Sequence, residues 1–168
     1  MKSAITKTRI FAAVLGGNLI FVFFNAAIAW TLAFFNVTPY GRFVAAFFRG
    51  RTREEVAARI GSDRALFDSM LAEASSFANL FLTPVSGFVM GLFAGAMLAK
   101  NRRLAVIWSV LAALPLSLFF IMKSGGGHEK FLYLVLFIAV TALGGLAGSA
   151  FFVKATSKKK KETADVDL

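Results

Sequence analysis

The sequence predicts an all-α integral membrane protein, a four-transmembrane-helix bundle with a short helical extramembrane module between helices 1 and 2. The 168 residues are 58% hydrophobic and only 17% charged, a composition outside the range of ordinary soluble domains. Four long apolar runs contain no Asp, Glu, Lys, Arg or His. Within these runs, small residues recur at the spacing by which membrane helices pack against one another.

The lengths of the apolar runs set the boundaries. A helix rises about 1.5 Å per residue and a hydrocarbon core is about 30 Å thick, so about 20 residues cross it. The runs therefore predict a basic flank (residues 1–9), transmembrane helix 1 (10–36), the helical module (37–77), transmembrane helices 2 (78–99), 3 (104–122) and 4 (131–153), and a basic, disordered C-terminal tail (154–168).

The first apolar run has a second interpretation as a secretory signal peptide. A basic start, an apolar stretch and the sequence Ala27-Ile28-Ala29 resemble the three parts of such a peptide. We expect the run to remain as a membrane helix, because it continues to Phe35, beyond the point where a cleaved segment would end.

Two helix starts are visible in the module. Thr38 followed by Pro39 is typical of an N-cap and a first helical position. Thr52 and Glu55 have the spacing of a capping box, in which each side chain satisfies a free backbone amide.

The first helix of the module is amphipathic. Its phenylalanines recur at three- and four-residue spacing with arginines beside them, a pattern typical of a helix that lies on lipid headgroups. The alternative is a helix that packs on the protein's own loops. The candidate headgroup residues are Arg42, Phe43, Phe47, Phe48 and Arg49.

A stripe of small residues organises the second membrane helix, where they recur every fourth position. Such a face lets helix backbones approach closely. The fourth membrane helix has a matching face, and the first offers Ala12, Ala13, Gly16 and Gly17. Packing within one protomer and a seam between copies are both open. The two main faces comprise Thr83, Gly87, Gly91, Gly95 and Ala99, and Thr141, Gly144, Gly145, Gly148 and Ser149.

The second membrane helix is the least hydrophobic of the four. Its Thr, Pro, Ser and Gly residues offset much of the insertion free energy of its apolar side chains. We therefore expect it at the centre of the bundle. Pro84 either starts the membrane helix at Thr83 or kinks a longer helix that arrives from the module.

Two asparagines lie deep in the first apolar run. Asn18 and Asn25 are seven residues apart, with Asn36 eleven further on, so the three share one helix face. An amide that faces lipid costs several kcal/mol. These intramembrane polar side chains are therefore expected either to form interhelical hydrogen bonds or to line a path for a solute.

Few signs of chemistry are present. Coupled transport ordinarily needs an ionisable group at membrane depth, and the apolar runs contain none. The chain has no Cys and one His. His128 and Glu129 form the only acid/base candidate, and we expect them to cap the next helix. The sequence predicts no catalytic site, cofactor or metal.

The basic residues favour one orientation. Eleven of the nineteen Lys and Arg residues flank the runs on the side of both termini, so we expect a multi-pass protein of the cell (inner) membrane with cytoplasmic termini. The net charge of +10 lies between and beyond the apolar runs. It therefore indicates anionic lipid headgroups as a partner, and no nucleic acid.

The expected function is non-enzymatic. Glycine-rich faces without buried charge are typical of a packing or accessory subunit of a membrane assembly, or of a homo-oligomer. One alternative is a passive pore or small-solute transporter lined by Asn18 and Asn25. A weaker alternative is a holin-like permeabiliser, suggested by the small size and the Lys-rich end.

Overall fold

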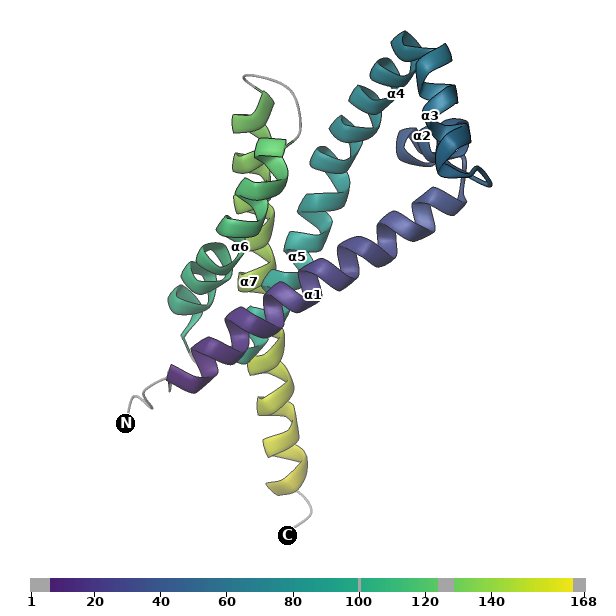
Figure 1. Cartoon of the computed structure of the whole chain (residues 1–168). Helices are drawn as coiled ribbons and strands as arrows, with labels where there is room; N and C mark the ends of the chain where they lie inside the picture. Colours follow the sequence, from purple (N-terminus) through teal and green to yellow (C-terminus); the bar gives the residue numbers. More distant parts are fainter. Residues whose placement is uncertain (1–6, 100, 124–128, 165–168) are drawn as a thin grey trace.

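The computed structural model describes residues 7–99, 101–123 and 129–164, which form helices and no strand. The helices α1, α5, α6 and α7 form a bundle, and α2, α3 and α4 form the module at one end of it (Figure 1). In chain order the elements are α1 (Lys7–Phe34), α2 (Pro39–Phe47), α3 (Arg53–Ser62), α4 (Arg64–Phe77), the π-helical turn η1 (Ala78–Leu82), α5 (Thr83–Met97), α6 (Arg102–Lys123) and α7 (Glu129–Ala164).

Side-chain caps begin the first two helices of the module, as their sequences predict. The Thr38 hydroxyl accepts a hydrogen bond of 3.1 Å from the Gly41 N–H at the start of α2. At the start of α3, the Thr52 N–H donates to the Glu55 carboxylate at 2.8 Å, and the Glu55 N–H donates to the Thr52 hydroxyl at 3.3 Å. Between them Gly50 has a φ of 70°, a conformation that favours glycine.

Pro84 lies inside one continuous helix that arrives from the module, and it does not start that helix. This helix, Arg64–Met97, is 34 residues long. Proline lacks an N–H and crowds the carbonyl four residues before it. In the π turn just before Pro84, the Thr83 N–H bonds to the Ala78 carbonyl five residues back. The widened turn therefore accommodates the proline without ending the helix.

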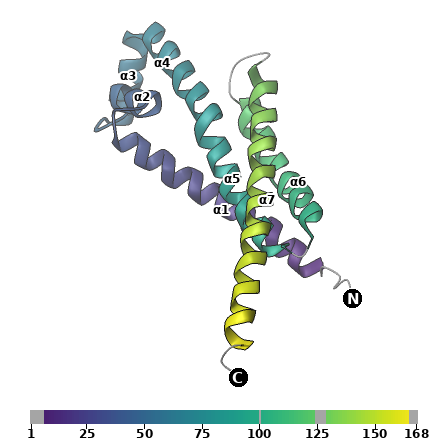
Figure 2. The same cartoon turned by 180° about the vertical axis from the view of Figure 1, so that it is seen from behind.

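α5 lies at the centre of the bundle, where its weak hydrophobicity predicts it. It packs against α1, α6 and α7 (Figure 1, Figure 2). Two buried apolar clusters join these helices, one around Met90 and the other around Ala94. Their members are Phe21, Met90, Ala112, Ala113 and Phe137, and Ala13, Ala94, Leu98 and Ala105.

Within the part of the chain that the structure describes, three helices are long and apolar enough to cross a membrane: Lys7–Phe34, Arg64–Met97 and Glu129–Ala155. The chain therefore has the helices of a membrane protein. The second of them is roughly 51 Å long, which exceeds a hydrocarbon core of about 30 Å. In α6, the apolar stretch found within the described residues, Arg103–Pro115, is shorter.

The C-terminal region differs from the predicted disordered tail. The tail was expected from residue 154 onward, whereas α7 continues as a helix to Ala164 and projects beyond the bundle (Figure 1). Extending an existing helix requires no new nucleation. Ala, Lys and Glu, which are good helix formers, make up most of this extension. Residues 165–168 lie outside the described part.

Candidate functional site

Glycines bring the backbones of α5 and α7 into direct contact. A Cβ atom on Gly91 would overlap the carbonyl oxygen of Thr141 and lie 2.9 Å from the amide nitrogen of Gly145. A Cβ atom on Gly95 would overlap the carbonyl oxygen of Gly145 and lie 2.9 Å from its carbonyl carbon. Backbone atoms cannot move aside as a flexible side chain can, so only glycine fits these two positions.

The contact is reciprocal, because glycines of α7 also meet the backbone of α5. Gly144 faces the carbonyl group of Phe88, and Gly148 faces that of Leu92. A Cβ atom on either glycine would overlap the carbonyl oxygen opposite. Sequence reasoning missed Phe88 and Leu92, because they contribute main-chain atoms and their large side chains give no small-residue signal.

The same two faces meet at Gly87. A Cβ atom there would lie 2.5 Å from the Thr141 hydroxyl oxygen and 2.7 Å from the Phe137 ring. Thr141 is fully buried, and its hydroxyl has no hydrogen-bond partner within the described part of the chain. The remaining members of the two predicted faces are also buried: Thr83, Ala99 and Ser149.

The predicted small face of α1 lies on α5. Ala13 is fully buried, and Gly17 is buried against the Met90 side chain, which a Cβ atom would approach to 3.3 Å. A Cβ atom on Gly16 would lie 2.7 Å from the Phe93 ring. These contacts are with side chains, so α1 packs less tightly on α5 than α7 does. Ala12 is half-buried.

The two asparagines of α1 have different partners. The Asn25 amide nitrogen donates to the Ser86 hydroxyl of α5 at 3.2 Å, and that hydroxyl donates to the Leu82 carbonyl at 2.8 Å. The Asn18 amide nitrogen donates within its own helix, to the Val14 carbonyl at 2.9 Å. Asn25 therefore joins two helices, whereas Asn18 does not do so through this bond. Asn36, beyond the end of α1, is exposed.

The Asn25–Ser86 pair is expected to couple α1 to α5. In a double-mutant cycle of Asn25→Ala and Ser86→Ala, measured by unfolding in detergent, we expect a coupling free energy of about 0.6–1.7 kcal/mol, the range for interhelical hydrogen bonds in membranes. The Asn18→Ala and Ser86→Ala cycle is the control and should show none. Zero coupling for Asn25, together with altered solute flux in liposomes for Asn25→Leu, would favour the pore.

α6 contributes a fourth small-residue face, whose members sequence reasoning did not name. Its buried members include Ala105 and Ser109, and the Ser109 hydroxyl donates to the Ala105 carbonyl at 2.6 Å. A Cβ atom on Gly145 would lie 3.1 Å from the same hydroxyl. The sequence pattern that could have predicted this face is the spacing of four, seven and eight residues from Ala105 to Ser109, Ala112 and Ala113.

Two residues predicted to contact lipid headgroups are buried inside the module. Phe47 is fully buried and Phe43 is 8% exposed, in a cluster with Ala74 of α4. The Phe47 and Phe67 rings meet edge to face, with centroids 5.1 Å apart. This arrangement is the alternative in which the helix packs on the protein itself, and it removes Phe43 and Phe47 from contact with lipid. Arg42 and Phe48 remain exposed.

The remaining predicted headgroup residue, Arg49, contacts the end of α1. Its guanidinium donates to the carbonyl groups of Ala33 and Phe34, the latter at 2.9 Å. The last carbonyl groups of a helix have no partner within it, and a cation there also interacts favourably with the helix dipole. Arg49 therefore fixes α2 to the C-terminal end of α1.

The acid/base candidate is only partly described, because His128 lies outside the described residues. Glu129 starts α7 and accepts a hydrogen bond of 3.0 Å from the Tyr133 hydroxyl. Across residues 7–99, 101–123 and 129–164, no three His, Cys, Asp or Glu side chains are grouped to hold a metal ion. No protein family, curated protein sequence or solved structure matches this chain.

Proposed function

We propose that this chain is a non-enzymatic, four-span protein of the cell (inner) membrane, with cytoplasmic termini, that acts as a packing or accessory subunit. Its assembly would contain other membrane proteins or further copies of the chain. The glycine faces of α5 and α7 pack against each other within one protomer. A partner would therefore contact a different surface.

α6 is proposed as the fourth span. It runs over Arg102–Lys123, and the residues between its charged ends are all uncharged. Its 22 residues correspond to roughly 33 Å of helix, close to the thickness of a hydrocarbon core. α6 also packs along both α5 and α7.

The uncovered face of α1 is the observation that carries the proposal. Only 17% of the most apolar 18-residue segment of α1 is buried, whereas 50% of the corresponding segment of Arg64–Met97 is buried. Phe23 is 70% exposed and Trp30 is 76% exposed. The C-terminal half of α1 also runs obliquely away from α6 and α7 (Figure 1, Figure 2). The exposed face of this half, on the side of Phe23 and Trp30, lacks the neighbours through which membrane helices gain dispersion contacts, so it is the proposed contact with a partner subunit.

Site-specific photocrosslinking in native membranes tests this proposal. We expect benzoylphenylalanine at Phe23 to give a discrete cross-linked protein band. The matched control is Phe151 of α7, another phenylalanine, which is 80% exposed but lies outside the proposed contact. A self-assembled protein would give a band of about twice the 18.2 kDa protomer mass.

The outcome against the proposal is also clear. If Phe23 and Trp30 label only lipid, as Phe151 is expected to do, α1 faces the bilayer. A monomeric mass in mild detergent would then leave no basis for an assembly.

A further inference from the structure

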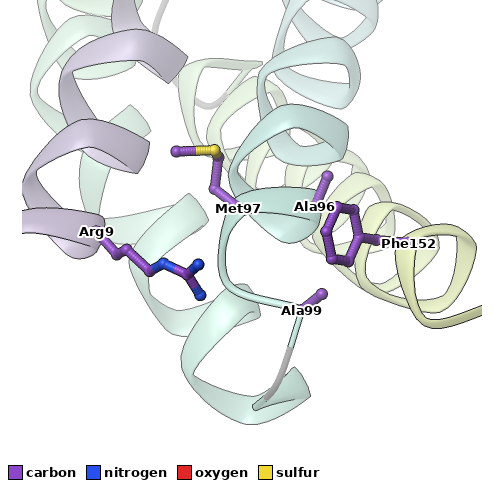
Figure 3. A pocket seen from close by; sticks show the side chains of 5 residues that line it. All are labelled: Arg9, Ala96, Met97, Ala99 and Phe152. Atoms are coloured by element: carbon purple, nitrogen blue, oxygen red, sulfur yellow. The ribbon is translucent and has the colours of Figure 1, made fainter. Parts of the chain in front are cut away.

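A hollow of about 220 Å³ lies at the end of the bundle that holds the α5–α6 turn. One of its walls is Arg9, from the first turns of α1, and the other wall residues are apolar (Figure 3). The Arg9 guanidinium extends toward the last turn of α5, while the Phe152 ring stands against that turn from α7 (Figure 3). The lining residues are Arg9, Ala96, Met97, Ala99 and Phe152.

The helices around this hollow carry no acidic residue close to it in the sequence, and the first one beyond Phe152 on α7 is Glu162, ten residues further on. α1, α5 and α6 contain no Asp or Glu, and α7 has none between Lys130 and Lys161. The acidic residues of the module, and Glu129, lie at the opposite end of the bundle (Figure 1). Arg9 is exposed, so its guanidinium is available to an external anion.

A second hollow at the same end repeats this arrangement. It measures about 360 Å³ and lies between α6 and α7. Arg103, in the first turn of α6, stands at this hollow, and the remaining wall is apolar: Val106, Ile107 and Leu146. Two separate surfaces at one end of the bundle thus combine a single arginine with an apolar wall.

We propose that the Arg9 hollow binds an anionic glycerophospholipid, with Arg9 on the phosphate and an acyl chain along Met97 and Phe152. A guanidinium binds phosphate oxygens through charge-assisted, bidentate hydrogen bonds. A free anion would gain nothing from the apolar wall, and an acyl chain alone would gain nothing from the arginine. This step rests on the proposed function, which puts this end of the bundle on the cytoplasmic side, where basic pockets between membrane helices are typical sites for such headgroups.

Native mass spectrometry of the full chain in mild detergent tests the proposal. With equal amounts of phosphatidylglycerol and phosphatidylcholine added, we expect phosphatidylglycerol to remain bound preferentially. Arg9→Gln should weaken its binding about tenfold, which corresponds to about 1.4 kcal/mol. Lys7→Gln is the matched control, because Lys7 lies on the same end of α1 but not in the hollow, and it should change binding less than twofold.

Two further measurements distinguish binding of the whole lipid from binding of its headgroup alone. Glycerol 3-phosphate should fail to compete with phosphatidylglycerol, and Met97→Ser should weaken lipid binding by severalfold. Competition by glycerol 3-phosphate at equal concentration would show a simple anion site and overturn the proposal. Equal retention of both lipids by the unmodified protein would also overturn it, and so would equal losses for Arg9→Gln and Lys7→Gln. The comparison of the two lipids needs no variant, so a misfolded variant does not prevent a decision.

Discussion

Gly95→Ala is expected to destabilise the helix bundle by about 1–3 kcal/mol, the usual cost of forcing extra atoms into a packed interior. The new methyl group would overlap the carbonyl oxygen of Gly145. α5 and α7 would have to separate, and they would lose dispersion contacts along the whole interface. Unfolding by SDS in mixed micelles, followed by circular dichroism, measures this loss.

Gly61→Ala is the matched control for this change. Gly61 also lies within a helix, but nothing lies within 4 Å of the position of its Cβ atom. Since alanine favours helix more than glycine does, Gly61→Ala should be neutral or stabilise α3 by up to about 1 kcal/mol. If Gly95→Ala proved as harmless as Gly61→Ala, the backbones of α5 and α7 would not be in contact.

The spacing of the small residues predicts both small-residue faces, on α5 and on α7. A glycine every fourth residue from Gly87 to Gly95 lies along one side of a helix, whatever that helix packs against. Spacing alone does not give the register between two helices. That Gly91 lies opposite Thr141, or that Gly148 lies opposite Leu92, depends on the crossing angle and on backbone atoms that every residue shares.

The path of the chain around Pro84 was open for a similar reason. Proline in a helical pattern signals either a start or a distortion. Which one occurs depends on whether the preceding residues gain enough by staying helical. Here Ala74 is buried against Phe43 and Phe47, so α4 is fixed by the module and continues into α5. That contact joins residues far apart in the sequence, and no local pattern contains it.

The amphipathic pattern of α2 left its environment open. Periodicity shows that Phe43 and Phe47 share one face, but lipid and protein both cover such a face. Whether protein or lipid covers this face depends on α4, whose Phe67 and Met70 pack on the same cluster. The α2 pattern alone does not predict which of the two covers it.

Phe47→Ala is expected to lower the stability of the module by about 3–5 kcal/mol, as removal of a buried aromatic side chain does. Phe47 is fully buried and contacts the rings of Phe43 and Phe67. The turn after α2 carries Arg49 and Arg51, at which trypsin cleaves. Cleavage that requires opening of the module should therefore become a hundredfold faster or more, at about 1.4 kcal/mol for each factor of ten.

Phe48→Ala separates this prediction from the headgroup hypothesis. Phe48 is the next residue and the same type, but it is 40% exposed, so its removal should accelerate cleavage no more than severalfold. Binding of the full chain to anionic vesicles gives the second readout. If Phe47→Ala left cleavage unchanged and weakened vesicle binding more than Phe48→Ala, Phe47 would face lipid. α2 would then be the headgroup-binding helix that the spacing of its phenylalanines allows.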